Sequence, residues 1–470
     1  MSGDTTTLRY QSTGSRDPIW TRVSGDPHQS NVTNQRHGLK EPVRLDSSGV
    51  PLTAAETKSK GLNVISTAIF IAGEMAGSGI LALPRAVVDS GWIGLVLCVV
   101  FCVNAGYGGT RLGACWAILE ERYPEHRAPV RNPYTMIAYR AYGTWISKSV
   151  SCCIQLTLFG AGTVYLLIAS QIAKELAQGM APSIGYCLWF LIICLLLCPP
   201  MWLGSPKDFM VVAIGALLAT AVACVLIFSQ IVMDGMNSTD PVLHKAHGFD
   251  SFFLSFGTIL FAFGGASTFP TIQNDMVEKH KFSQSVIIGF SVILMLYLPV
   301  TIGGYFVFGD GVDVNIILSL NRTSLVVAAN ILMAVHLVLA FLIVINPVCQ
   351  ELEEVFKIPH KFHWKRCAVR SSMMLVMLFI GESVPQFGKL LSLVGGSTVT
   401  LLTFVFPSLF YMRLCDQKHV DWPQRSIPVH VRVYLWELIL IGLAGGAAST
   451  YSAIVAIFGS VSVTTPCYWS

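Results

Sequence analysis

Charged residues are scarce in this sequence of 470 residues: Asp, Glu, Lys and Arg together make up 12% of it, whereas soluble domains carry about 25%. Apolar residues make up 53%, more than a soluble chain of this length could bury in one core. The net charge is only +4, with no concentrated basic domain, so nucleic acid is not expected as a partner. The composition predicts a protein embedded in a lipid bilayer.

Motifs of several functional classes are also lacking. None of the 13 cysteines forms a CxxC pair or a His/Cys cluster with zinc spacing, and most lie in apolar runs, where small packing residues are expected. The sequence contains no nucleophile elbow, HExxH, P-loop or paired-carboxylate motif. We therefore expect neither an enzyme nor a metal or organic cofactor.

The N-terminal region differs from the rest of the chain. Residues 1–58 are rich in Ser, Thr, Gly, Asp and Arg and show no apolar periodicity. They also lack the pattern of a secretory signal peptide. This composition predicts a disordered N-terminal tail, with membrane insertion directed by the first spanning helix.

Long apolar runs fill the remainder. A helix needs roughly 20 apolar residues to cross the hydrocarbon core of a bilayer. Eleven segments meet this need, near 63–88, 91–118, 146–173, 184–203, 208–233, 252–275, 284–308, 324–349, 367–384, 387–412 and 434–460. We expect an all-α membrane protein with a transmembrane domain at 59–460 and a short tail at 461–470.

Lys and Arg are distributed unequally between the two sets of loops. One set and its helix ends offer little beyond Arg85, Lys174, Lys245, Arg322 and Lys389. The other set carries Arg122, Arg127, Arg131, Arg140, Lys207, Lys279, Lys281, Lys357, Lys361, Lys365, Arg366, Arg370, Arg413, Lys418, Arg425 and Arg432. Because positive charge marks cytosolic loops, the N-terminus is predicted to be cytosolic and the C-terminal tail non-cytosolic.

Glycosylation sequons give an independent indication of orientation. Asn237-Ser-Thr and Asn321-Arg-Thr both fall in loops assigned to the non-cytosolic side. Asn31-Val-Thr falls in the tail assigned to the cytosol. We therefore expect glycan only at Asn237 or Asn321.

Two predicted spans carry matching interruptions. The first contains Gly77-Ser78-Gly79 and the sixth contains Gly264-Gly265, and in each a proline follows the last glycine by five residues. The next spans, second and seventh, each contain a Gly-Tyr pair. Each half has five spans, so the second half enters the membrane from the opposite side. This is the pattern of an inverted repeat.

The interruptions indicate a binding site. Glycine costs a helix about 1 kcal/mol and proline about 3 kcal/mol. Irregular backbone at membrane depth is tolerated where it is buried in protein or lines a cavity, and paired broken helices mark the substrate sites of transporters. The alternative is that the glycines only allow close helix packing. The residues we expect to bind substrate are Gly77, Ser78, Gly79, Phe263, Gly264, Gly265, Ala266 and Ser267.

The same residues carry a resemblance to a known family. GSGILALPRA at 77–86 and FGTILFAFGGASTFPTIQNDM at 256–276 resemble the first-helix and sixth-helix signatures of the amino acid/auxin permease family. GGYFVFGD at 303–310 and the pair Asn346-Pro347 also fit, and the likeness extends over roughly residues 58–460. The resemblance implies the five-plus-five inverted-repeat fold of the bacterial leucine transporter with one added helix, and an amino acid as the substrate.

Some positions depart from that family's pattern. Arg85 and Glu74 stand where many members carry uncharged residues, and the first helix lacks the histidine of proton-assisted members. The extracellular cysteine pair of that branch has no counterpart between 234 and 251. The coupling ion, H⁺ or Na⁺, is therefore open on the resemblance alone.

Polar residues within the spans are candidates for coupling. An ionisable side chain inside a membrane is by default a functional-site hypothesis, and Glu74, beside the first interruption, can take up and release a proton. Its alternative is a structural ion pair or a permanently protonated carboxyl. Asn346 leaves a sodium site open, Tyr165 could face the site or pack, and His336 is more typical of hydrogen-bonded packing.

The sequence thus predicts a secondary active transporter that moves amino acids by alternating access, with proton symport favoured over sodium. A nutrient-sensing transceptor or a channel-like protein on the same scaffold is the alternative. Either a plasma membrane or an endolysosomal or vesicular membrane suits the topology.

Overall fold

The computed structural model describes residues 61–127, 130–203, 209–238, 241–245, 247–358, 363–459 and 466–469. The predicted tail at 1–58, with Asn31, lies outside these residues, as does most of the segment 461–470. Within the described residues the regular structure is helical, with one isolated bridge between Leu62 and Met276. The prediction of an all-α protein is confirmed.

Each predicted span coincides with one helix or with consecutive helices. The longer elements are α2 (Val64–Met75), α3 (Ser78–Ser90), α4 (Ile93–Arg122), α5 (Pro133–Tyr142), α6 (Thr144–Ala177), α7 (Tyr186–Leu203), α8 (Phe209–Asn237), α9 (Phe249–Ala262), α10 (Phe269–Asn274), α11 (Phe282–Phe308), α12 (Ser324–Val355), α13 (Trp364–Ser383), α14 (Phe387–Val394), α15 (Phe406–Asp416) and α16 (Val429–Phe458). Two π-helical turns, Gly395–Val399 and Leu401–Val405, join α14 to α15.

Eight helices in the described part of the chain are long and apolar enough to cross a membrane by themselves. The pair α2 and α3, bent by 61°, makes a ninth span. The two other predicted spans are α9, which is apolar but only 14 residues long before its interruption, and α13, whose first turns carry several cations. Hydropathy by itself therefore underrates the broken and the polar spans.

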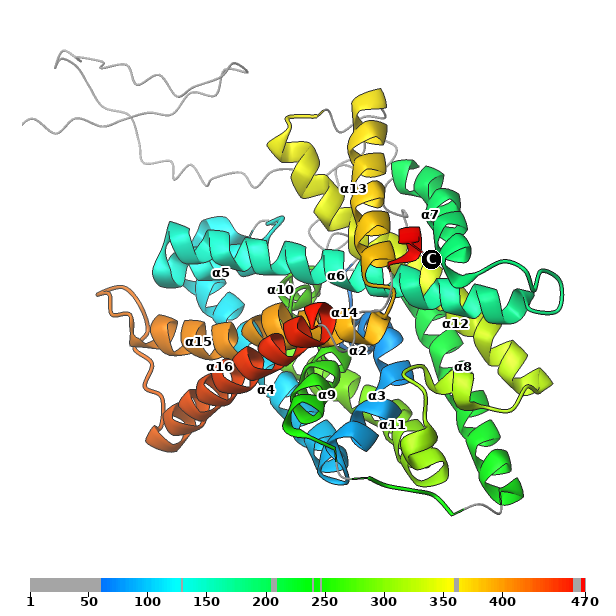
Figure 1. Cartoon of the computed structure of the whole chain (residues 1–470). Helices are drawn as coiled ribbons and strands as arrows, with labels where there is room; N and C mark the ends of the chain where they lie inside the picture. Colours follow the sequence, from blue (N-terminus) through cyan, green and yellow to red (C-terminus); the bar gives the residue numbers. More distant parts are fainter. Residues whose placement is uncertain are drawn as a thin grey trace, which may run out of the picture. The chain divides into compact units, whose positions relative to one another are not determined.

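The order of the elements fits five spans, a second set of five, and one added helix. The pair α2 and α3 opens the first set and the pair α9 and α10 opens the second, so the two interruptions occupy corresponding places. In Figure 1, α2, α3 and α9 lie in the middle of the helical bundle, with α16 beside α9. The interrupted helices are thus the innermost part of the fold.

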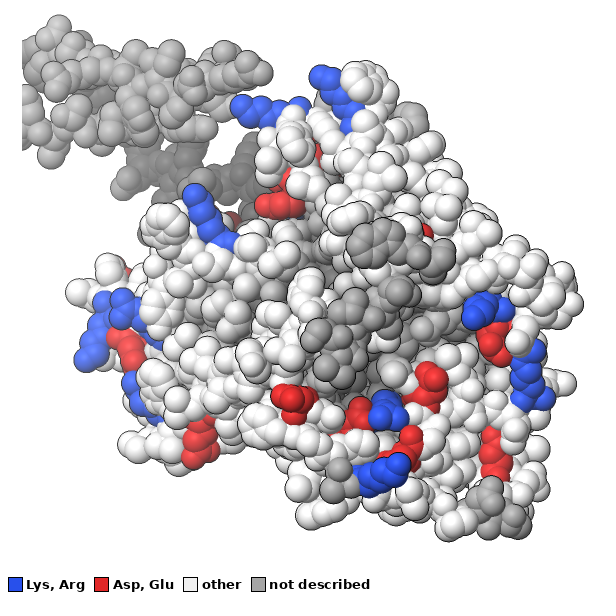
Figure 2. Space-filling view, viewed as in Figure 1, with Lys and Arg blue, Asp and Glu red and all other residues white. Residues whose placement is uncertain are grey.

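The core forms around these inner helices. Helix α12 packs along α6 and α8, α2 packs against α8 and α11, and α3 packs against α9. Large apolar side chains on the outer faces stay exposed, such as Leu218, Val222 and Val225 of α8. Figure 2 shows a mostly uncharged surface on which Lys, Arg, Asp and Glu gather in small groups of mixed sign. Such a surface suits contact with lipid.

A disulfide joins two distant parts of the chain. Cys187, in the first turn of α7, is bonded to Cys467 in a short 3-10 turn at 467–469. Both residues lie on the side predicted to be non-cytosolic, and disulfides persist in the oxidising compartments that non-cytosolic loops face. The bond therefore agrees with the predicted orientation. The remaining cysteines in the described residues are free and mostly buried, as packing residues are.

Candidate functional site

The first interruption is short. Helix α2 ends at Met75 and α3 begins at Ser78, with only Ala76 and Gly77 between them. The first backbone N–H groups of a helix have no partner within that helix, so the start of α3 offers amide hydrogens and the positive end of a helix dipole. Ser78 and Gly79 place these groups at mid-bundle. The local geometry is suited to binding an anion.

Side chains from other helices donate hydrogen bonds to the carbonyl groups of this interruption. The Tyr297 hydroxyl of α11 donates to the Met75 carbonyl at 3.0 Å. The Thr220 hydroxyl of α8 donates to the Ala76 carbonyl at 3.2 Å. Gly77 is held against α12, because a Cβ at this position would lie 2.7 Å from Nε2 of His336. The interruption is therefore fixed from three sides.

The second interruption is longer. Helix α9 ends at Ala262 and α10 begins at Phe269. Two turn-like hydrogen bonds shape the segment between them, from the Gly264 amide to the Phe261 carbonyl at 3.0 Å and from the Thr268 amide to the Gly265 carbonyl at 3.3 Å. Because this backbone is not helical, carbonyl groups at the end of α9 lack their usual partners. They form the negative end of that helix.

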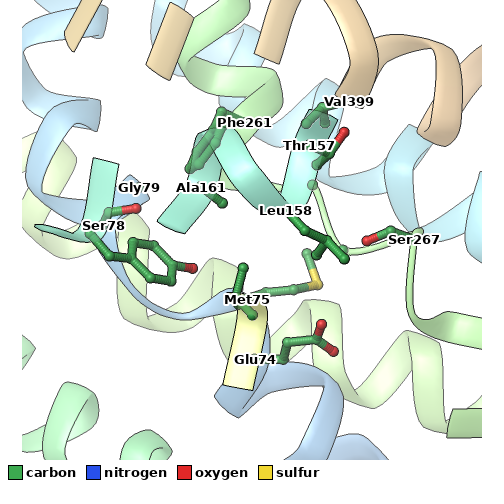
Figure 3. Close-up of a pocket in the computed structure, with 14 residues that line it drawn as sticks. Glu74, Met75, Ser78, Gly79, Thr157, Leu158, Ala161, Phe261, Ser267 and Val399 are labelled. Carbon is green, nitrogen blue, oxygen red and sulfur yellow. The ribbon is translucent and has the colours of Figure 1, made fainter. Parts of the chain in front are cut away.

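A cavity lies between the two interruptions. Its lining comes from α2, α3, α6, α9, the segment after α9, α12 and the first π-helical turn, and consists of Glu74, Met75, Ser78, Gly79, Thr157, Leu158, Ala161, Tyr165, Phe261, Gly264, Gly265, Ser267, Val344 and Val399. Figure 3 shows Glu74 and Met75 on one side of the space, and Phe261, Thr157 and Val399 across from them. The paired interruptions thus face one shared space.

Glu74 connects the two broken helices. The hydroxyl of Thr268, just before α10, lies 2.7 Å from Oε2 of Glu74 and also 3.1 Å from the Gly265 carbonyl. Among the described residues no cation forms an ion pair with this carboxyl group, which contradicts the structural ion-pair alternative within that part of the chain. Glu74 is therefore placed to sense a change in either interruption.

Most of the residues predicted to bind substrate lie at this cavity. Ser78, Gly79, Gly264, Gly265 and Ser267 are in its lining, together with the coupling candidate Glu74. The other predicted residues, Gly77, Phe263, Ala266 and Asn346, are buried but are not in the lining.

Two of these exceptions have a local cause. Gly77 faces His336, and the Phe263 ring packs on Tyr297 with 5.8 Å between ring centroids. Ala266 is 2% exposed, and Asn346 is buried on α12 two residues beyond Val344, which does line the cavity. Whether each predicted residue contacts substrate stays a prediction.

One wall of the cavity was missed by the sequence analysis. Thr157, Leu158, Ala161 and Tyr165 come from α6, and only Tyr165 had been considered. Their spacing places them on one face of a helix, which is a detectable signal, but many apolar helices show the same spacing. Thr157 is anchored by a hydrogen bond of 2.7 Å to the hydroxyl of Thr398.

The glycines of the interruptions also serve close packing. A Cβ on Gly79 would lie 2.7 Å from the Cα of Ala262, and a Cβ on Gly264 would lie 2.5 Å from a methyl group of Val399. On Gly265 it would meet the side chain of Met75 at 2.6 Å. The two interpretations of the glycine clusters, packing and cavity lining, therefore hold together rather than exclude each other.

Known proteins resemble this chain in sequence. A family model described as transmembrane amino acid transporter protein matches residues 60–455. The amino acid transporter AVT1B of Arabidopsis thaliana is 24% identical over 397 residues, covering 82% of this chain and 69% of that protein. The amino acid transporter AVT1H of the same plant is 27% identical over 376 residues, covering 77% and 84%.

Solved structures share the fold. A mutant of the Eremococcus coleocola manganese transporter superposes with a TM-score of 0.54 at 14% sequence identity, covering 90% of this chain and 94% of that one. At this identity the likeness concerns the fold alone, which is that of the bacterial leucine transporter. With the family match over most of its length, this chain belongs to the transmembrane amino acid transporter family, the amino acid/auxin permeases, and is a multi-pass membrane protein.

Proposed function

We propose that this protein carries neutral amino acids across a membrane by alternating access, with a proton as the coupling ion. The observation that carries the proposal is the single cavity that both interrupted helices line, with a helix N-terminus and a carboxyl group at its wall. Its family membership supports an amino acid as the substrate.

The cavity offers both halves of an amino acid a partner. The α-carboxylate suits the amide groups at the start of α3, where the hydroxyl of Ser78 is buried and has no hydrogen-bond partner in the described structure. The α-ammonium suits the carbonyl end of α9 and the carboxyl of Glu74. Both groups are attached to the same Cα, and the cavity brings the start of α3 and the end of α9 to one shared space.

The rest of the lining favours uncharged substrate side chains. Leu158, Ala161, Phe261, Val344 and Val399 are apolar, and the lining contains no Lys, Arg, Asp or second Glu. A charged substrate side chain would lose its hydration there without gaining a partner, which costs several kcal/mol in a low-dielectric site. We therefore assign the substrate to the neutral class.

Proton coupling is supported by how the first interruption is satisfied. Unwound carbonyls commonly coordinate the coupling cation in this fold class. Here the Met75 and Ala76 carbonyls already accept hydrogen bonds from Tyr297 and Thr220, which reduces their availability to sodium. Glu74, in contrast, is a titratable group that touches both interruptions.

The test is uptake by the full chain reconstituted into vesicles. A panel of labelled neutral, acidic and basic amino acids is measured at pH 5.5 and 7.5 in the external medium, with and without sodium, beside protein-free vesicles. We expect accumulation of neutral amino acids that depends on a proton gradient and not on sodium. Binding without flux would favour a transceptor, downhill flux alone a channel-like protein, and sodium-dependent accumulation would refute proton coupling.

A further inference from the structure

The ring of His336 lies directly behind the first interruption. It belongs to the middle of α12 and is 0% exposed. Its Nδ1 lies 3.0 Å from the Thr220 hydroxyl and 3.2 Å from the Ala216 carbonyl, both on α8. Its Nε2 has no hydrogen-bond partner in the described structure and faces Gly77. A buried polar atom without a partner calls for an explanation.

The hydrogen-bond network fixes where the ring proton sits. The Ala216 carbonyl can only accept, so the neutral ring carries its proton on Nδ1. The Thr220 hydroxyl gives its own hydrogen to the Ala76 carbonyl and accepts from the ring. Nε2 is then a bare lone pair, aimed at the backbone between α2 and α3. Helix packing explains the Nδ1 contacts but does not explain Nε2.

We propose that Nε2 of His336 is a proton-binding site that controls the geometry of the interruption between α2 and α3. This rests on the proposed function and adds a second proton site to it, at Gly77 of the same interruption that Glu74 adjoins. A proton arriving at Nε2 converts the neutral ring to a cation, with no other bond made or broken. The charged ring then needs an acceptor that the present geometry does not supply.

That requirement links protonation to movement. A buried cation without an acceptor is strongly unfavourable, so the protonated ring favours an arrangement in which a carbonyl at Ala76 or Gly77 turns toward it. The neutral ring favours the arrangement seen here, held through Thr220. Two states with different proton affinities are what a proton gradient needs to bias a carrier.

The titratable groups around the ring of His336 come from several helices. No charged side chain among the described residues forms a hydrogen bond or ion pair with His336. The helices packed on α12 carry, in their middle parts, Tyr165 of α6, Cys194 and Cys198 of α7, and Cys224 of α8, and α13 adds Glu382 near its end. At the interruption itself, α2 adds Glu74 and α11 adds Tyr297. Of these, only Glu74 and Glu382 are carboxyl groups, and Glu74 is the one that adjoins the interruption that the ring faces.

The key variant is His336→Asn. The asparagine amide can replace Nδ1 as donor to Ala216 and Thr220, so the packing contact is kept, whereas nothing replaces Nε2. Thr220→Val, which cuts the link from the ring to the Ala76 carbonyl, is the second variant. His430→Asn, the same change at an exposed position of α16, is the matched control.

The first measurement needs no substrate. Ser267 lines the cavity, so the full chain with Ser267→Cys in vesicles is labelled with a membrane-impermeant methanethiosulfonate between pH 5 and 8. The chain without Ser267→Cys corrects for native cysteines. The protein with both Ser267→Cys and His336→Asn reports how the titration of the thiol itself affects labelling. Relative to this protein, we expect the labelling rate of the Ser267→Cys protein to change about tenfold between pH 5 and 8, equivalent to a one-unit shift in a linked proton equilibrium. Thr220→Val is expected to reduce this change, and His430→Asn to leave it intact.

The second measurement is uptake of labelled L-alanine as a function of pH. His336→Asn is expected to flatten the pH profile while exchange across the membrane persists. An unchanged labelling profile and an unchanged uptake profile in folded His336→Asn would overturn the proposal. If the Ser267→Cys protein labels in a pH-dependent, His336-dependent manner but the wild type moves none of the amino acids in the panel, the proposed function fails and the proton site stands.

Discussion

The two interrupted helices match in sequence but differ in geometry. The first interruption comprises only Ala76 and Gly77, and hydrogen bonds from α8 and α11 hold its carbonyls. The second extends from Phe263 to Thr268 and is held mostly by its own turns. After the first comes a helix of 13 residues, and after the second one of only 6.

Because of this difference, the two interruptions are suited to different roles. The short, clamped interruption presents the start of a long helix and sits between two titratable side chains, Glu74 and His336, so it suits ion coupling. The long one contributes more of its backbone and small side chains to the cavity, so it suits recognition of substrate shape. On the proposed function, the inverted repeat therefore supplies two equivalent segments with different roles.

The largest effect is expected from Glu74→Gln. Glutamine mimics the protonated carboxyl but cannot release a proton, so accumulation against a gradient should fall at least about tenfold, a free-energy difference of about 1.4 kcal/mol. The pH dependence of uptake should flatten, while exchange across the membrane is expected to remain measurable. Glu437→Gln, at an exposed carboxyl of α16, is the control. A mutant that keeps the wild-type pH profile and still concentrates substrate would show that Glu74 is structural.

A pair of glycine variants separates packing from lining. Gly79→Ala places a methyl group against the backbone of Ala262, and overpacking of this kind typically costs 1–3 kcal/mol, so we expect a lower melting temperature and less protein at the surface. Gly265→Ala meets the flexible side chain of Met75, so surface expression should survive while uptake falls. Thermal melts and surface biotinylation measure the first effect and transport kinetics the second. If the two variants were equally stable, the distinction between packing at Gly79 and cavity lining at Gly265 would be wrong.

A moderate effect is expected from Thr268→Val. This change keeps the shape and removes the hydroxyl that donates to Glu74, a bond worth about 1.5–3 kcal/mol for a charged acceptor. Without the donor the ionised carboxyl is less stable, so the pH at which uptake is half-maximal should move upward. Ser251→Ala, in the first turn of α9, serves as the control. A downward shift would contradict the assigned donor role.

The smallest effect is expected from Tyr297→Phe. It frees the Met75 carbonyl at the cost of one neutral hydrogen bond, about 1 kcal/mol. We expect a slightly lower melting temperature and, because an unwound carbonyl becomes available, some sodium sensitivity of uptake. Uptake measured in choline and in sodium chloride provides the readout. If sodium changes uptake by neither the wild type nor the Tyr297→Phe variant, this hydrogen bond does not govern the choice of coupling ion.

The sequence predicted the interruptions well because glycine and proline act locally. The clusters around Gly79 and Gly265 break their helices wherever the rest of the chain lies, and the spans follow from apolar length. The detailed lining could not be predicted, because it depends on how helix ends rotate. Phe263 was expected in the cavity but turns toward Tyr297, while Phe261, two residues earlier, lines it.

Distant contacts were the other limit. His336 was expected to be ordinary packing, since no sequence pattern links it to Gly77, which is far away along the chain. The wall from α6 is another case: its residues are ordinary for an apolar helix, and only the position of α6 beside the second interruption gives them a role. Local signals therefore found the interruptions, and three-dimensional packing assigned the partners.

The bond between Cys187 and Cys467 joins residues 280 positions apart and closes a covalent loop that contains all of the second repeat. A protease that cuts the loop after α12, which is predicted to be cytosolic, would therefore leave two fragments that migrate as one species until a reductant is added. Because this disulfide forms only where thiols are oxidised, the protein is expected to fold in an oxidising compartment. An expression host without an oxidising secretory pathway is expected to produce chains in which the turn at 467–469 is not bonded to α7.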